Sequence, residues 1–350
     1  MVVATNTTSI RSEKIRHIEL PIIDLKAEKS EVVKKIVKAC EEFGFFKVIN
    51  HGVPSDVISR MEEEGKEFFA KPVCEKQQAG PANPYGYGSK NIGIMGDQGE
   101  VEYILLQTNP LGISEKTQRI STDPMKFRYA VTSYIEAVRE VACEILELIS
   151  EGLGVPLDTS VLSRLIRDVE SDSVFRLNHY PPLKDSNKNT SASSFHHHEN
   201  QNSTSNCNSN NRVIGFGEHT DPQILTLLTS NDVGGLQISL EDGVWIPVNP
   251  QPISSFCVFV GDVLEAMTNG RFPSVRHRVI VNRVEARMSM ALFASPPLHA
   301  KISPIPELLS GNNKKLFRSF TWAEYKKTTY ANRLGERRLS FFMILEDEEC

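Results

Sequence analysis

The sequence of 350 residues contains neither a long apolar run nor an obvious targeting segment. Residues 1–8 lack the apolar stretch of a signal peptide. The most apolar later stretch, residues 256–267, is interrupted by Asp262 and Glu265 and is too short to span a bilayer. We therefore expect a soluble protein without a membrane span, located in the cytoplasm, with the nucleus as a second location.

Paired cysteines and basic tracts are also missing. No two of the six cysteines form a Cys-x-x-Cys pair, so the sequence indicates neither a zinc site nor a disulfide framework. The 39 Lys and Arg residues are outnumbered by 44 Asp and Glu residues, which gives a net charge of −5. This balance argues against a broad nucleic-acid-binding surface.

What the sequence does contain is typical of a globular protein, with 40% apolar and 24% charged residues. Short strands separated by tight turns are predicted throughout its second half, with turn signals at Asp242-Gly243 and Asn269-Gly270. The predicted strands cover residues 175–180, 224–228, 235–240, 244–248, 256–260, 276–281 and 288–293. Such a series predicts a mainly β fold with flanking helices and a double-stranded β-helix, or jelly-roll, core.

Helices are predicted around this core. Asp123 followed by Pro124 starts a long helix with one apolar face. Ser30 is expected to cap an earlier helix, which ends at Gly44. Thr321 and Glu324 are expected to form a capping box at the start of a last helix, residues 322–334. Further strands are expected at residues 18–25, 45–50 and 102–106. We divide the chain into an N-terminal region (17–112), a scaffold helix (123–154), a jelly-roll core (171–299) and a C-terminal helical segment (300–350).

An insert of low complexity interrupts the predicted core at residues 184–211. It is rich in Ser, Asn and His and includes three adjacent histidines, residues 196–198, which could chelate a metal. Because the insert has almost no apolar residues to bury, we expect it to be disordered and any metal binding to be adventitious.

Two histidines and one aspartate form a candidate metal site. His219 and Asp221 are two positions apart, so in an extended chain both side chains project from one face. His277 lies in an alternating segment with Val275 and Val279, which places one polar group on an apolar face. Two imidazoles and one carboxylate on one side of a metal are typical of Fe(II) oxygenases.

Arg287 and Ser289 repeat the same spacing ten residues after His277. A guanidinium and a hydroxyl on one strand face suit the distal carboxylate of a small diacid. A His-x-Asp pair or an Arg-x-Ser pair alone occurs often by chance. The hypothesis of an iron site with a diacid anchor depends on their occurrence together in this order. By contrast, His51 is predicted to lie in a turn, and the glycine-rich residues 84–99 do not follow the spacing of a dinucleotide-binding loop.

The order of these motifs, preceded by Asn-His-Tyr-Pro-Pro at residues 178–182, resembles the plant 2-oxoglutarate- and Fe(II)-dependent dioxygenases. Residues 21–25 and 44–53 resemble the N-terminal region of that family. The resemblance implies an Fe(II) cofactor, 2-oxoglutarate and O2 as cosubstrates, and stimulation by ascorbate. It also implies that Arg287 and Ser289 bind 2-oxoglutarate, with Tyr180 as a further hydrogen bond.

Within that family, the flanking segments look most like gibberellin 2-oxidases that act on nineteen-carbon gibberellins. These segments are residues 215–223, 267–275, 295–297 and 320–325. This resemblance implies hydroxylation at carbon 2 of a gibberellin, which inactivates the hormone. It also places Tyr103, Tyr325 and Lys326 near the substrate, as residues that line the substrate pocket and bind the substrate carboxylate. Glu100 occupies a position where such proteins usually carry an aromatic residue.

Other functions are compatible with the shared iron and Arg-x-Ser residues. A gibberellin 3- or 20-oxidase or a flavonoid dioxygenase would use the same residues, and so would an ascorbate-dependent relative. A catalytically inactive binding protein of the same fold is the third alternative. Succinate release coupled to substrate oxidation distinguishes an oxygenase that uses 2-oxoglutarate from the other two classes. The sequence does not fix the oligomeric state.

Overall fold

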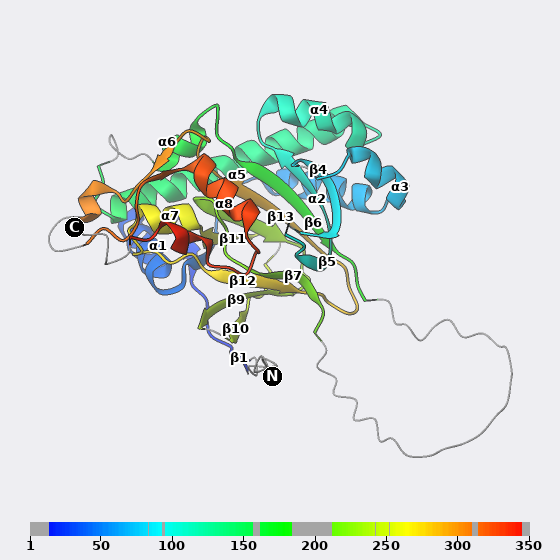
Figure 1. Cartoon of the computed structure of the whole chain (residues 1–350). Coiled ribbons are helices and arrows are strands. Elements are labelled where there is room, and N and C mark those ends of the chain that lie inside the picture. Colours follow the sequence, from blue (N-terminus) through cyan, green and yellow to red (C-terminus); the bar gives the residue numbers. More distant parts are fainter. Residues whose placement is uncertain are drawn as a thin grey trace, which may run out of the picture.

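The computed structural model describes residues 14–82, 84–92, 95–156, 162–183, 212–241, 243–251, 253–309 and 314–344 (Figure 1). The insert at residues 184–211, with its three histidines, lies outside the described residues.

Two sheets form the centre of the molecule (Figure 1). The larger sheet has eight strands in the order β2-β3-β11-β8-β13-β6-β5-β4 and the smaller has five in the order β1-β10-β9-β12-β7. The strands of the larger sheet are β2 (Ile22–Asp24), β3 (Phe45–Ile49), β4 (Gly86–Asn91), β5 (Gln98–Gln107), β6 (Val174–Tyr180), β8 (Leu225–Ser230), β11 (Ser255–Val260) and β13 (Arg287–Ala294). Those of the smaller sheet are β1 (Lys14–Ile15), β7 (Ile214–His219), β9 (Leu236–Glu241), β10 (Val244–Pro247) and β12 (Arg276–Ile280).

Alternation along the central strands creates two apolar cores. On β11, Phe256 and Val258 join the core that the helices share, whereas Cys257 and Phe259 join a second core with residues of both sheets. Successive strand residues point to opposite faces, so one strand serves both layers. The sheets therefore face each other across an apolar interior, as the predicted jelly roll requires.

Helices cover the outer face of the larger sheet (Figure 1). The 29-residue helix α5 (Pro124–Gly152) contacts α1 (Lys29–Phe43), α2 (Ser55–Phe69), α4 (Pro110–Ile120) and α6 (Leu162–Arg167). Its buried face includes Phe127, Val131, Tyr134 and Val138, which follow the spacing of an amphipathic helix. The remaining short elements are α3 (Val73–Lys76), α7 (Asp262–Met267), α8 (Trp322–Ala331), β14 (Lys301–Ile302), β15 (Phe320–Thr321), η1 (Gln77–Ala79), η2 (Pro306–Leu309) and η3 (Arg338–Phe342).

Of the predicted helix caps, those at Asp123, Gly44 and Thr321 are confirmed and that at Ser30 is wrong. Asp123 caps α5 by accepting a hydrogen bond from the Lys126 amide, and α8 begins with the predicted capping box. Gly44 ends α1 with a φ of 59°, a left-handed conformation that glycine adopts without strain. The prediction of Ser30 as the cap of α1 is wrong: the Glu28 carboxylate accepts from the amides of residues 30 and 31 instead.

Other predicted bounds differ by a few residues. The strand expected at residues 18–25 is limited to β2, and the helix expected at residues 322–334 ends at Ala331. Sequence reasoning did not predict α4, α6 or α7. His51 is buried in the irregular segment between β3 and α2, where its Nδ1 accepts a hydrogen bond from the Val53 amide. Among the described helices, none combines the length and the apolar character needed to cross a membrane.

Candidate metal and cosubstrate site

Strand pairing brings the two candidate histidines together. His277 on β12 is the direct antiparallel partner of His219 at the end of β7. Their ring centroids are 4.1 Å apart. Asp221 follows β7 by two residues, so the three side chains converge although 58 positions separate the two histidines along the sequence.

The ligand atoms of this triad are close enough to share one ion. Oδ1 of Asp221 is 3.5 Å from Nε2 of His219 and 3.6 Å from Nε2 of His277. One donor atom from each of the three residues lies within 4.8 Å of the others. Asp221 and His277 are buried and His219 is nearly so.

Backbone carbonyls orient both rings. Nδ1 of His219 lies 2.8 Å from the Gly217 carbonyl oxygen, and Nδ1 of His277 lies 3.2 Å from that of Val275. A carbonyl accepts hydrogen bonds only, so Nδ1 carries the proton on each ring and Nε2 keeps its lone pair. Both lone pairs therefore point toward Asp221.

The protonation states also suit metal binding. Burial, together with the charge of His219, lowers the pKa of His277 to about 4, which favours the neutral imidazole. Burial alone would raise the pKa of Asp221, but the nearby rings of His277 and His219 hold this pKa below its usual range, because each ring stabilises the carboxylate when the ring is protonated. Neutral imidazoles and an ionised carboxylate are the forms that bind a metal.

Asp221 retains an unused ligand atom. Its Oδ2 is buried and has no hydrogen-bond partner within the described part of the chain. A buried carboxylate oxygen without a partner is costly unless a cation or donor completes it. The donor set of two histidines and one carboxylate fits Fe(II).

Arg287 is a second buried group that lacks hydrogen-bond partners within the described residues. Its side chain is 1% exposed, and among the described residues neither Nε nor Nη1 has a partner. It lies on β13 directly opposite Tyr180 on β6, with its guanidinium carbon 5.4 Å from the centre of that ring. Ser289, two residues further along β13, is also buried, and its Oγ lies 3.5 Å from the side-chain nitrogen Nδ2 of Asn178. A buried guanidinium with two spare donors fits a carboxylate.

A cavity of about 610 Å³ opens beside the triad and is lined in part by His219 and Asp221. Its volume is within the range of small-molecule sites. Arg287 is not among its lining residues but borders a separate pocket of about 10 Å³. Two of the three candidate metal ligands therefore face a large cavity, and the candidate diacid anchor is set apart from it.

The three predicted substrate residues differ in their placement. Tyr103 lines the cavity and donates its hydroxyl hydrogen to the Asn91 carbonyl. Lys326 also lines the cavity, but its ammonium group is bound to both carboxylate oxygens of Asp172, at 2.9 and 2.7 Å. Tyr325 does not line the cavity: its side chain is fully buried and its hydroxyl donates to Asp262 at 2.6 Å, so the expected role at the substrate wall does not fit.

Sequence reasoning did not identify Arg176, which lines the cavity with a buried guanidinium. Its Nε donates to Asn178 at 2.8 Å, whereas Nη2 has no partner in the described residues. The guanidinium lies 3.8 Å from the ring centre of Tyr103 and 4.9 Å from that of Phe216. The spacing Arg176-x-Asn178-x-Tyr180 on one strand face was the available signal.

Glu100 lies away from the cavity. It forms an ion pair with Lys90 at 3.4 Å and does not line the cavity wall.

Comparison with known proteins identifies two matching family models. Residues 171–296 match the 2OG-Fe(II) oxygenase superfamily, and residues 20–104 match the N-terminal region described as that of non-haem dioxygenases in morphine synthesis. Thus the triad and Arg287 lie within the oxygenase match.

Curated relatives match nearly the whole chain. Gibberellin 2-beta-dioxygenase 4 of Arabidopsis thaliana is 49% identical, with 96% of this chain and 99% of the relative aligned. Gibberellin 2-beta-dioxygenase 1 of Pisum sativum is 48% identical, with 91% and 89% aligned.

Solved structures share the fold. A crystal structure of JOX2 in complex with 2OG, Fe and JA has a TM-score of 0.76 and 27% identity, covering 95% of this chain and 91% of that one. A dioxygenase for auxin oxidation in rice has a TM-score of 0.72 and 26% identity, covering 93% and 100%.

Proposed function

This chain belongs to the 2OG-Fe(II) oxygenase superfamily and, within it, to the gibberellin 2-beta-dioxygenases, and from this we propose that it hydroxylates carbon 2 of bioactive gibberellins. The reaction consumes O2 and 2-oxoglutarate, releases succinate and CO2, and inactivates the hormone. The observation that carries this proposal is the buried His-Asp-His triad beside a cavity of small-molecule size, in a chain 43–49% identical to eight gibberellin 2-beta-dioxygenases.

His219, Asp221 and His277 hold the iron in this proposal. When bound, Fe(II) supplies the oxygen chemistry that couples oxidation of a C–H bond to decarboxylation of 2-oxoglutarate. The residues contribute three ligands on one side and leave other positions for the cosubstrates. The two Nδ1–H groups, fixed on backbone carbonyls, keep the imidazoles in the orientation that presents Nε2.

Arg287, Ser289 and Tyr180 bind 2-oxoglutarate. The buried guanidinium satisfies its free Nε–H and Nη1–H groups with the distal carboxylate, and the neighbouring hydroxyls add hydrogen bonds. Because this anchor is buried, water does not compete for the carboxylate, and charge-assisted bonds are strong in such surroundings.

Arg176 is the substrate anchor that the cavity geometry favours. A gibberellin is a rigid, largely apolar acid, so it requires an apolar cavity with one cationic donor. Arg176 has a free Nη2 at the cavity, whereas the ammonium of Lys326 is paired with Asp172. A fixed carboxylate orients the rigid skeleton, and orientation decides which C–H bond is oxidised.

Product analysis tests the function directly. The purified protein is incubated with Fe(II), ascorbate, 2-oxoglutarate and a 3-hydroxylated nineteen-carbon gibberellin, and we expect a product heavier by one oxygen, located at carbon 2. Succinate should form in equal amount. Oxidation at carbon 20 or carbon 3 of a precursor, with no action on the finished hormone, would place the chain with a biosynthetic oxidase instead. Turnover of 2-oxoglutarate that no gibberellin stimulates would contradict the proposal.

Substrate acids and their methyl esters test the anchor. The wild-type protein should favour the acid, and Arg176→Gln should raise the KM for the acid by about 10- to 150-fold, the equivalent of about 1.5–3 kcal/mol. The preference for acid over ester should disappear in that variant. Lys326→Met is the matched comparison, and a loss of acid preference in it but not in Arg176→Gln would assign the anchor to Lys326.

A further inference from the structure

The backbone that carries Asp221 lies beyond the end of a strand. β7 ends at His219, and no strand in the described sheets pairs with Thr220 or Asp221. Sheet hydrogen bonds therefore do not fix the orientation of this proposed ligand. Other contacts must hold the backbone in place.

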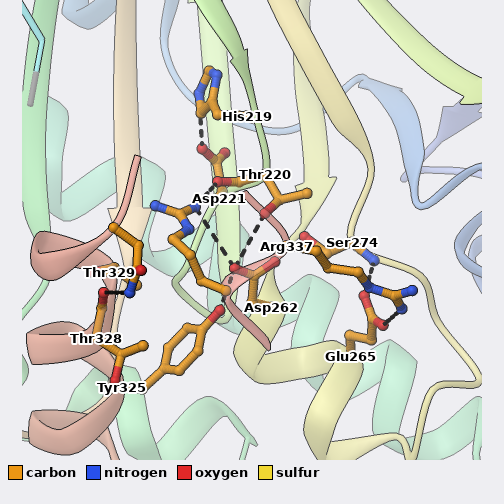
Figure 2. A network of polar contacts seen from close by, with 12 residues as sticks. His219, Thr220, Asp221, Asp262, Glu265, Ser274, Tyr325, Thr328, Thr329 and Arg337 are labelled. Carbon is orange, nitrogen blue, oxygen red and sulfur yellow. Dashed lines mark hydrogen bonds and ion pairs between the residues drawn. The ribbon is translucent and has the colours of Figure 1, made fainter. Parts of the chain in front are cut away.

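Three hydrogen bonds hold this segment. The Thr220 carbonyl accepts from Nη2 of Arg338 at 2.6 Å, and the Thr220 hydroxyl donates to Oδ2 of Asp262 at 3.3 Å. The backbone amide of Asp262 donates to the Asp221 carbonyl at 2.8 Å. Figure 2 shows Thr220 beside Asp221, with a dashed line that joins the Thr220 side chain to Asp262 below.

Asp262 is in turn held by the C-terminal segment. Its Oδ2 accepts from the Tyr325 hydroxyl at 2.6 Å, as Figure 2 shows, and lies 3.9 Å from Nη2 of Arg338. The exposed fractions of Asp262, Tyr325 and Arg338 are 2%, 0% and 3%. Hydrogen bonds among charged groups in such dry surroundings are strong, and losing one partner is costly.

Close packing leaves this arrangement little freedom. A side chain at Gly261 would overlap the Gln223 carbonyl oxygen and lie 3.1 Å from that of Asp221. The start of α7 is therefore pressed against the ligand-bearing segment. A shift of Asp262 would move the Asp221 backbone with it.

Two C-terminal elements supply the outer part of the network. Tyr325 lies on α8 and Arg338 on η3, more than 100 residues after Asp221. The Tyr325 ring packs at 5.4 Å from Phe320 and 5.3 Å from Phe342, which joins the two elements. The C-terminal segment therefore acts as one unit against the metal-ligand backbone.

We propose that Asp262, Tyr325 and Arg338 form a clasp that positions Asp221 for metal binding, so that iron affinity depends on the docked C-terminal segment. These are positioning residues, since they act through Thr220 and the Asp221 backbone. The inference rests on the proposed role of the triad. Arg338 also lines the cavity, and its Nε has no partner among the described residues, so contact with substrate is the competing role that a test must separate.

The experiment compares Arg338→Ala, Arg338→Lys and Tyr325→Phe with the wild-type protein. Arg337→Ala is the matched control, because this neighbouring arginine is 69% exposed and pairs with Glu265 rather than with Thr220 or Asp262. For each protein, anaerobic dialysis gives the Fe(II) affinity, the ligand-field spectrum of the Co(II) form reports the coordination geometry, and thermal unfolding reports the folded state.

We expect Arg338→Ala to lose about 10- to 100-fold in Fe(II) affinity, as removal of groups behind metal ligands commonly does. Its Co(II) spectrum should change, and Arg338→Lys should restore part of the affinity. Tyr325→Phe, which removes a single hydroxyl, should lose affinity in the same direction by a smaller factor. Arg337→Ala should match the wild type in both measurements.

Each other outcome has a definite meaning. Wild-type Fe(II) affinity and Co(II) spectra in folded Arg338→Ala and Tyr325→Phe would overturn the clasp. A rise in substrate KM alone in Arg338→Ala would assign that arginine to substrate binding and also overturn it. If Arg338→Ala does not fold, Tyr325→Phe decides. Absence of Co(II) binding by the wild-type protein would contradict the proposed metal site itself.

Discussion

At the scale of single residues, Asp221 is the point on which both histidines converge. Its Oδ1 faces the two Nε2 atoms at 3.5 and 3.6 Å, and its Oδ2 lacks a partner within the described residues. In the proposed metal site, the carboxylate therefore contributes both a ligand atom and the negative charge that offsets the cation.

We predict that Asp221→Ala abolishes measurable turnover and Fe(II) binding while the protein stays folded. Two neutral imidazoles remain, and they hold iron weakly without the carboxylate. Equilibrium dialysis and succinate release measure both losses. Glu218→Gln is the matched control, because Glu218 adjoins the triad in sequence but pairs with Arg276. More than a tenth of wild-type activity in Asp221→Ala would contradict the assignment of the triad.

Arg287 differs from the exposed arginines because its guanidinium is buried and, among the described residues, its Nε and Nη1 have no hydrogen-bond partner. We predict that Arg287→Ala raises the 2-oxoglutarate KM by about 10- to 150-fold, from the loss of a charge-assisted bond of about 1.5–3 kcal/mol. The KM for the hormone should change far less. Arg271→Ala, which removes a surface arginine paired with Glu41, is the control. An unchanged 2-oxoglutarate KM in Arg287→Ala would rule out Arg287 as the anchor.

At the scale of elements, Glu102 on β5 joins four segments beside the core. It accepts hydrogen bonds from Lys76 on α3 at 2.6 Å and from the Tyr87 hydroxyl on β4 at 2.7 Å, and lies 2.8 Å from Nδ1 of His179 on β6. Burial would raise the pKa of Glu102, but the contacts with His179, Lys76 and Tyr87 lower it to about 2, against an ordinary value of 4.5.

This lowered pKa makes a pH-dependent contribution to stability. The ionised carboxylate stabilises the fold above the unfolded-state pKa, and this stabilisation is lost as pH falls from about 4.5 toward about 2. We predict that Glu102→Gln lowers the free energy of unfolding by on the order of 3 kcal/mol at about pH 7, and by roughly 1 kcal/mol less at about pH 3.5.

Urea unfolding of both proteins at the two pH values measures this difference. Glu100→Gln is the control on the same strand, because its ion pair with Lys90 is on the surface and should contribute under about 1 kcal/mol at either pH. An equal destabilisation by Glu102→Gln at both pH values would show that the contribution does not arise from the charge.

At the scale of the whole molecule, the site joins segments that are distant in sequence. The two histidines of the proposed metal site lie on β7 and β12 of the smaller sheet, Asp221 follows β7, and the proposed cosubstrate anchor lies on β13 of the larger sheet. A ligand bound between the two sheets therefore stabilises their association, and it cannot bind in the same way once the chain unfolds.

We predict that Mn(II), as an inactive substitute for Fe(II), together with 2-oxoglutarate raises the unfolding temperature of the metal-free protein. At 100 times the Kd, one site adds about 2.7 kcal/mol to the free energy of unfolding. Thermal unfolding with and without a chelator measures the effect, and Asp221→Ala should show no response to the metal. The same response in that variant would show that the metal binds elsewhere.

The sequence by itself determined the jelly-roll core, the helix caps at Asp123 and Thr321, and the residues proposed as metal and cosubstrate ligands. The triad, Arg287 and Ser289 follow from local rules, since strand alternation and the i, i+2 spacing depend only on neighbouring residues, whereas Tyr180 was implied by the family resemblance. The same local reasoning was wrong for Ser30, because the helix begins at Lys29 and the Glu28 carboxylate accepts from the amides of residues 30 and 31.

Only the tertiary structure decided which side chains reach the cavity. Local pattern does not show whether a polar side chain in the C-terminal segment meets substrate, another charge or the protein interior. Lys326 is paired with Asp172, Tyr325 is buried on Asp262, and Arg176 retains a free donor at the cavity. The two contacts join residues 63 and 154 positions apart, and the free donor of Arg176 reflects the absence of a partner in the described chain. The packing of the whole fold decides all three outcomes.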